Sequence, residues 1–102
     1  MPLRPAVSPI QQSKRDSVGK RLQEYSEDEK QVLRYLLQHG QVEQMRLRAS
    51  CGVPFEAVAG ALPKAKAHQI IKTVYPSRQG YPHHWEINPE LHDALRFHLL
   101  GD

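Results

Sequence analysis

The segment from residue 41 to residue 71 constrains the fold of this chain more than any other. It holds two stretches with the apolar spacing of helices, separated by a short turn at residues 51–54. Gly52 suits the end of the first helix. Pro54 suits the start of the second, because the N–H that proline lacks has no partner in the first turn of a helix. An apolar run over residues 70–74 follows at once and indicates a strand. The segment therefore predicts helix, turn, helix and strand, in that order.

Each of the two predicted helices has an inward stripe. The first, over residues 42–51, is expected to turn Val42, Met45 and Ala49 inward, with Leu47 or Cys51 at the edge. The second is expected to bury Phe55, Val58, Ala59, Leu62 and Ala65. Pro63 interrupts the second helix at a cost of about 3 kcal/mol. We therefore predict either a kink at Pro63 or a helix that ends near Leu62.

A further helix is predicted before this segment. Ser26 can accept a hydrogen bond from the first turn, and Glu29 three residues later completes a capping box. The inward stripe of this helix consists of Val32, Leu33, Leu36 and Leu37. Gly40 is the predicted C-terminal stop.

The C-terminal third predicts a hairpin and a last helix. Residues 70–75 and 84–88 are the two expected strands, with a turn-rich loop between them and with Trp85 and Ile87 on one strand face. Asn88 suits the cap of a helix that Pro89 begins and Gly101 ends. The apolar stripe of that helix is Leu91, Ala94, Leu95 and Leu99. This stripe either packs on the core of the domain or pairs with a second copy of the chain.

The N-terminal residues look different. Residues 1–16 have no helical or strand period and contain Pro2, Pro5 and Pro9, so we predict a disordered basic arm. Residues 17–25 are a possible short helix with Val18, Leu22 and Tyr25 on one face. A chain of 102 residues has room for one small domain, which we place at residues 17–102.

Positive charge is concentrated in two regions. The chain has a net charge of +3, whereas residues 41–80 alone contain six basic and two acidic residues, a net charge of +4. Residues 1–25 contain five basic and two acidic residues, a net charge of +3. This distribution favours an anionic partner, most commonly nucleic acid. A solvated surface of mixed charge is the alternative.

Several classes of protein are disfavoured. The single cysteine, Cys51, cannot form an internal disulfide, and the sequence has no zinc-binding cysteine pattern. His83 and His84 are adjacent in a predicted strand and point to opposite faces, so they do not suit one metal ion. No catalytic constellation, phosphate-binding loop or apolar run long enough for a membrane is present. We therefore expect an intracellular protein, in cytoplasm, nucleoid or nucleus, that is not an enzyme and uses no cofactor or metal.

Over residues 26–88 the chain resembles the winged helix-turn-helix superfamily. The resemblance rests on the stop at His39-Gly40, the turn at Gly52 and the strand, loop and strand that follow, together with the spacing of Val42, Met45, Val58 and Leu62. In many members a glycine precedes the first wing strand, where this chain has His68 or Gln69. The resemblance implies a mainly α fold with a small β-hairpin: a three-helix core, a two-stranded wing and a C-terminal helix.

The resemblance also implies a function. Members that bind double-stranded DNA lay the helix after the turn in the major groove. Carried over, the groove-facing residues are Glu56, Ala57, Gly60, Ala61 and Lys64, with Lys66 and His68 toward the end of the helix. They offer little for reading bases, so phosphate contacts should dominate. The candidate nucleic-acid-binding residues are Lys14, Arg15, Arg46, Arg48, Lys64, Lys66, His68, Lys72, Arg78 and Gln79.

Two interpretations of the function remain open. The first is DNA binding within a transcription-regulatory or replication assembly. The second is a protein-interaction winged helix in a larger complex, suggested by the small side chains of Ala57, Gly60 and Ala61. Either form is expected to be a monomer, or a homodimer formed through the C-terminal helix.

Overall fold

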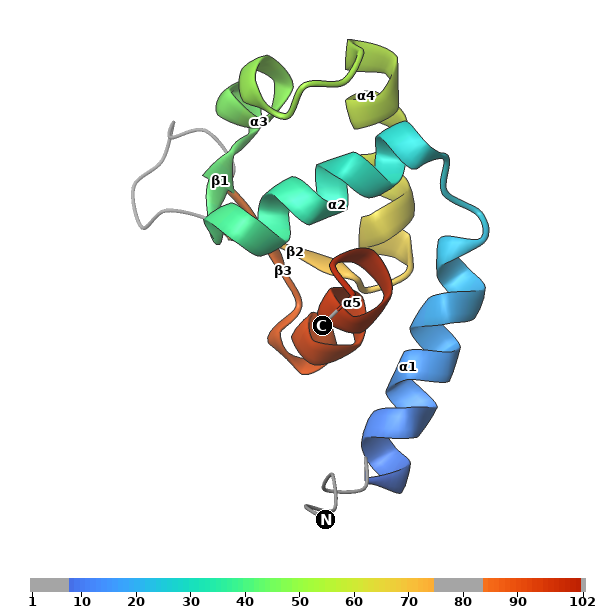
Figure 1. The fold of residues 1–102 in the computed structure, drawn as a ribbon. Helices are drawn as coiled ribbons and strands as arrows, with labels where there is room; N and C mark the ends of the chain where they lie inside the picture. Colours follow the sequence, from blue (N-terminus) through green and yellow to red (C-terminus); the bar gives the residue numbers. More distant parts are fainter. Residues whose placement is uncertain (1–7, 75–83, 102) are drawn as a thin grey trace.

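A computed structural model describes residues 8–74 and 84–101. Within these residues the elements are α1 (Pro9–Leu22), α2 (Glu27–His39), β1 (Val42–Glu43), α3 (Gln44–Ser50), α4 (Phe55–Ala67), β2 (Ile71–Val74), β3 (His84–Ile87), the short 3-10 helix η1 (Pro89–Leu91) and α5 (His92–Leu99). Figure 1 shows α2, α4 and α5 gathered against the small sheet, while α1 runs along one side toward the N-terminus. The predicted order of helices and strands is confirmed.

The sheet has one strand more than predicted. β1 joins β3 in antiparallel register, with Val42 opposite Trp85, and β3 pairs on its other edge with β2, where Ile71 lies opposite Ile87. The strand order is therefore β1-β3-β2, and β3 is central. The segment before the helix-turn-helix is thus hydrogen-bonded to the returning strand of the wing.

α2 follows its sequence signals closely. The backbone N–H of Glu29 donates to Ser26 Oγ at 3.1 Å, and the backbone N–H of Ser26 donates to Glu29 Oε1 at 2.9 Å. These two bonds form the predicted capping box. Gly40 ends the helix with φ of 72°, a conformation that glycine adopts without strain. The predicted inward stripe is buried, together with Tyr35.

The predicted boundary and inward face of α3 are wrong. Val42 and Glu43 belong to β1, so the helix starts two residues later than expected and turns a different face to the core. Leu47 and Cys51 are buried, whereas Ala49 is exposed and Met45 has 69% of its surface exposed. The apolar spacing alone did not show that the first two residues pair as a strand.

α4 runs through Pro63 without ending there. Ala59 and Pro63 both lie on the exposed side of α4. The Ala59 carbonyl receives no helical hydrogen bond, because proline has no N–H, but water can donate one to it there. Val58, Leu62 and Ala65 are buried as predicted, and Ala61 is also buried. The predicted burial of Ala59 and Phe55 is wrong, because Phe55 at the first position of the helix is 52% exposed.

α1 corrects the expectation for the N-terminal region. Residues 9–16 are helical and continue into the predicted short helix. Ser8 Oγ accepts a hydrogen bond from the Gln11 N–H at 3.2 Å, and Pro9 occupies the first helical position. The sequence did not predict the first half of this helix because α1 has few apolar residues, and only Val18 and Leu22 are buried in it. Residues 1–7 of the predicted arm lie outside the described residues.

α5 shows where the C-terminal stripe goes. Asn88 Oδ1 accepts from the Glu90 N–H at 3.2 Å, which confirms Asn88 as a cap, and a 3-10 turn precedes the α-helix. Ala94, Leu95 and Leu99 are buried in the core of their own chain. These three residues of the stripe therefore pack on the core of the domain, which is the first of the two predicted alternatives.

Candidate nucleic-acid interface

The exposed face of α4 is the natural candidate for an interface, and it overlaps the predicted face only in part. The exposed residues of α4 are Phe55, Glu56, Ala59, Gly60, Pro63, Lys66 and Ala67. Ala61 is fully buried and Ala57 is half-buried. Gly60 lies against α2, because a Cβ there would sit 3.0 Å from Glu29 Oε2. The predicted groove-facing set is therefore corrected: Ala57, Ala61 and Lys64 turn toward the body of the protein.

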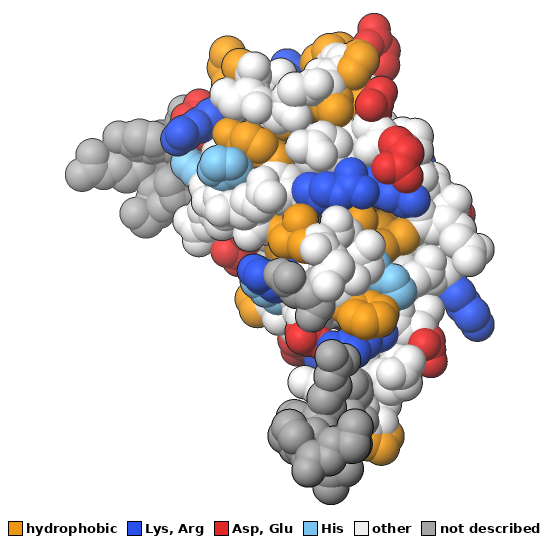
Figure 2. All heavy atoms as spheres, viewed as in Figure 1, with side chains coloured by type: hydrophobic (Ala, Val, Ile, Leu, Met, Phe, Trp, Pro, Cys, Tyr) orange, Lys and Arg blue, Asp and Glu red, His pale blue; other side chains and the backbone are white. Residues whose placement is uncertain are grey.

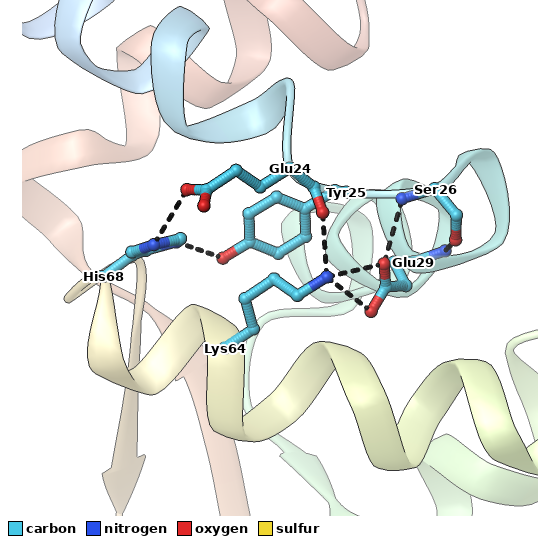
Figure 3. A network of polar contacts seen from close by, with 6 residues as sticks. All are labelled: Glu24, Tyr25, Ser26, Glu29, Lys64 and His68. Carbon is cyan, nitrogen blue, oxygen red and sulfur yellow. Dashed lines mark hydrogen bonds and ion pairs between the residues drawn. The ribbon is translucent and has the colours of Figure 1, made fainter.

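Lys64 is engaged inside the fold. Its Nζ donates to Glu29 Oε1 at 2.9 Å, to Glu29 Oε2 at 3.1 Å and to the Glu24 carbonyl at 2.8 Å, and it lies 5.0 Å from the centre of the Tyr25 ring (Figure 3). Three acceptors use the three donors of the ammonium group. Lys64 therefore joins α4 to the start of α2, while 33% of its side chain stays exposed.

His68 belongs to the same cluster. Its Nδ1 lies 2.9 Å from the Tyr25 hydroxyl, and its Nε2 lies 3.2 Å from Glu24 Oε2 (Figure 3). Burial, followed by the carboxylates of Glu29 and Glu24, raises the pKa of the Tyr25 phenol well above its ordinary value. Tyr25 thus keeps its proton and can donate it to Nδ1, which leaves the proton of a neutral ring on Nε2, facing Glu24. We call Glu24, Tyr25, Ser26, Glu29, Lys64 and His68 the polar cluster.

Two pairs of basic residues remain on the outside, one at each end of α4. Arg46 and Arg48 are exposed on α3 beside the start of α4, and the Arg48 guanidinium lies 4.4 Å from the centre of the Phe55 ring. Lys66 and Lys72 are exposed at the other end and line one hollow of about 310 Å³. Within the described residues, neither lysine has a hydrogen-bond or ion-pair partner.

Gln69 lies at the floor of this hollow and has φ of 61°, the left-handed conformation in which glycine is favoured. Its carbonyl accepts a hydrogen bond from Asn88 Nδ2 at 2.9 Å. The resemblance to winged helices predicts a glycine at this place in many members of the superfamily. This chain has Gln69 instead of glycine, and its polar side chain lines the same hollow as Lys66 and Lys72.

The basic residues of α1 divide between two environments. Lys14 lines a second hollow, of about 280 Å³, that shares Gln69, Asn88 and the acidic Glu90 with the first. Arg15 instead bonds Asp93 of α5 at 3.4 Å, and its guanidinium lies 4.2 Å from the centre of the Phe97 ring. Lys14 is therefore near the candidate interface, whereas Arg15 holds α1 to α5. Arg78 and Gln79 lie outside the described residues.

The face of the molecule that carries α2 has mixed charge. In Figure 2, Lys and Arg side chains cross the middle of this face beside Asp and Glu side chains. Glu27 lies 3.3 Å from Lys30 and 3.6 Å from Arg34, and the hydrogen bond from Lys30 is the main reason that the pKa of Glu27 is lowered. Charges on this face neutralise one another, so it is a poor candidate for an anionic partner.

Other kinds of site find little support in the described part of the chain. Residues 8–74 and 84–101 contain no group of three or more histidine, cysteine, aspartate or glutamate side chains placed to hold a metal ion. Within the same ranges, no helix is long and apolar enough to cross a membrane.

Sequence reasoning missed Met45 and Phe55 as surface residues. Both had been placed inward because their spacing fits a helical stripe. The neighbouring Pro54 was the available signal, because it is the cap residue of α4. Phe55 is therefore the first residue of the helix and lies at the turn, where little of the chain covers its side chain.

Comparisons with known proteins identify the fold. No family model and no curated protein matches the sequence. Among solved structures, the chain resembles Rv1404 from Mycobacterium tuberculosis with a TM-score of 0.63 and 14% identity, over 81% of this chain and 56% of Rv1404. The chain thus spans little more than half the length of that protein.

Two further structures are informative. The MepR–DNA complex of S. aureus matches with a TM-score of 0.61 and 11% identity, over 85% of this chain and 73% of MepR. The homodimeric winged helix-turn-helix DNA-binding domain of Mb0332 from Mycobacterium bovis, a possible ArsR-family transcriptional regulator, matches with a TM-score of 0.59 and 20% identity, over 99% of this chain and 86% of the domain. With the element order and sheet above, these matches confirm that the chain has the winged helix-turn-helix fold.

Proposed function

We propose that this protein binds double-stranded DNA, with α4 in the major groove, and serves in the regulation of transcription. The observation that carries the proposal is the placement of two basic pairs at opposite ends of the exposed face of α4. One pair is Arg46 and Arg48, and the other is Lys66 and Lys72.

The dimensions agree with this placement. The eleven-residue step from Phe55 to Lys66 covers about 16 Å of helix, at about 1.5 Å per residue. The major groove of B-DNA is about 12 Å wide. A helix lying in that groove therefore brings basic side chains at its two ends within reach of the phosphates on either side.

The residues in the middle of the exposed face of α4 indicate which contacts this helix makes with DNA. Ala59 and Pro63 have no side-chain hydrogen-bond donors, so this part of α4 reads no base edge by hydrogen bonds. Phosphate contacts then supply most of the affinity, which should be sensitive to salt. Lys14, on the adjoining hollow, is the further candidate for a phosphate contact.

The proposed role in transcription has separate support. Mb0332, a possible transcriptional regulator, and MepR, solved with DNA, share this fold. Nothing in the described residues points to replication, so we restrict the proposal to regulation of transcription.

Salt dependence tests the proposal. Fluorescence anisotropy with a random-sequence duplex should give a plot of log affinity against log salt with a slope of about −3 to −4, because four basic residues each displace about 0.9 counterion. Reversing either pair, as Arg46→Glu with Arg48→Glu or Lys66→Glu with Lys72→Glu, should remove about two units of slope.

Lys30→Gln is the matched control, since it removes a positive charge from the mixed face of α2. Its affinity and slope should stay close to those of the wild type. Absence of binding at low salt, or binding that survives both double reversals in folded protein, contradicts the proposal.

A further inference from the structure

Two large apolar side chains are exposed together at the helix-turn-helix. Met45 on α3 and Phe55 at the start of α4 are 69% and 52% exposed. Arg48 connects them: it is one helical turn beyond Met45 on the same face of α3, and its guanidinium lies 4.4 Å from the centre of the Phe55 ring. Figure 2 shows hydrophobic side chains on the surface at this end of the molecule, over α3 and the first turn of α4. We call Met45, Arg48 and Phe55 the apolar ridge.

The charge around the ridge indicates what covers it. Arg48 lies within it, Arg46 is exposed on the same short helix, and Glu56 is exposed beside Phe55. An apolar surface is thus combined with two positive charges and one negative charge, a net positive charge. That combination complements a surface that is anionic at its edges and has apolar groups between them. The major groove of DNA has this character, since phosphates border it and the C5-methyl group of thymine is the apolar group exposed on its floor.

We propose that Phe55 and Met45 contact thymine methyl groups, so that the protein prefers sites containing thymine at the positions facing the start of α4. This inference rests on the proposed binding of DNA by α4 and adds a base preference to it. The first turn of α4 then selects bases by apolar contact, while the basic pairs hold the backbone without regard to sequence.

Replacing thymine with uracil tests the contact directly, because the two bases differ only in the C5-methyl group. We would compare the alternating polymers poly(dA-dT) and poly(dA-dU) as duplexes, by anisotropy competition at one salt concentration. Wild-type protein should bind the thymine polymer about fourfold more tightly for each methyl group covered.

Variants connect that preference to the ridge. Phe55→Ala combined with Met45→Ala should bring the ratio of the two affinities close to one, chiefly by weakening binding to the thymine polymer. Phe55→Leu, which keeps an apolar side chain, should retain part of the preference. Arg48→Gln should weaken binding to both polymers equally. Phe55 is half exposed, so these variants should fold, and circular dichroism checks that they do.

The outcomes separate the two proposals. Binding of both polymers with equal affinity overturns the thymine preference and leaves DNA binding intact. A preference that persists when Phe55 and Met45 are both replaced by alanine also overturns the inference, because the methyl groups are then sensed elsewhere. No binding to either polymer at low salt overturns the proposed function itself and leaves the ridge as a surface for a protein partner.

Discussion

The ammonium group of Lys64 illustrates how the surroundings of one residue decide its role. It is bonded to both carboxylate oxygens of Glu29 and to the Glu24 carbonyl, and the Glu29 side chain is only 12% exposed. Partial burial would raise the pKa of Glu29, but the Ser26 backbone N–H and the Lys64 ammonium outweigh it and lower that pKa. The charge of Lys64 therefore stabilises the fold.

This lowered pKa predicts how stability depends on pH. The carboxylate of Glu29 contributes stability above the unfolded pKa of about 4.3, and that contribution is lost as the pH falls toward and through the lower pKa of the folded state. Wild type should thus be more stable than Glu29→Gln near neutral pH, and the difference should shrink below about pH 4. Urea unfolding of both proteins across this range measures the difference.

Asp28→Asn controls for the loss of one negative charge from the start of α2, because Asp28 is exposed in the same first turn. If wild type and Glu29→Gln differ in stability by the same amount at pH 3 and at pH 6, then Lys64 does not stabilise the ionised form of Glu29.

Among the elements, the contact between α1 and α5 depends on a glycine. A Cβ at Gly19 would lie 2.9 Å from His98 Cε1, and His98 Nε2 donates to the Arg15 carbonyl at 2.6 Å. The imidazole thus packs across α1 where only glycine leaves room. This explains a glycine in the middle of a helix, where alanine is favoured by about 1 kcal/mol.

A double-mutant cycle tests this interpretation. In the wild type, Gly19→Ala should lower the free energy of unfolding or leave it unchanged, because His98 must move and lose its bond to Arg15. In a His98→Ala background the same change should raise the free energy of unfolding by about 1 kcal/mol. Chemical denaturation of the four proteins gives the coupling, and equal effects of Gly19→Ala in both backgrounds would disprove it.

How much of each element could be predicted depends on how local its signals are. The cap, stripe and stop of α2 lie within its own sequence, and all three were predicted correctly. The predicted inward face of α3 was wrong because Val42 pairs as a strand with Trp85, more than forty residues away along the chain. No local spacing of apolar residues shows that pairing. The predicted groove-facing position of Lys64 on α4 was missed for the same reason, because its partner Glu29 lies on another helix.

Besides the apolar ridge, two large apolar side chains are exposed among the described residues of the molecule. Ile10 on the first turn of α1 is 70% exposed, and Phe97 on α5 is 43% exposed. The first half of α1 buries no apolar residue and is held to α5 through Arg15, and a short helix with little apolar packing is only marginally stable in water. We therefore propose that a homodimer forms through α1 and the outer side of α5.

Sedimentation equilibrium tests this assembly. Wild type should pass from monomer to dimer with increasing concentration, and Ile10→Lys should shift that transition to higher concentration without changing the fold of the monomer. Gln38→Lys adds a charge to an exposed position on α2 and is the matched control. A wild-type protein that stays monomeric at every concentration would contradict the proposal.

Under the proposed binding of DNA, the central position of β3 limits the kind of duplex that fits. β3 is bonded on one edge to β1, which leads directly into α3, and on the other to β2, which follows α4. The wing and the helix-turn-helix therefore cannot change their separation without breaking strand pairs. A ligand that spans both has to match a fixed spacing, so a stiff duplex of the wrong groove width is rejected and a pliable one is bent to fit. Preference among DNA sites would then follow the flexibility of the duplex as well as its bases.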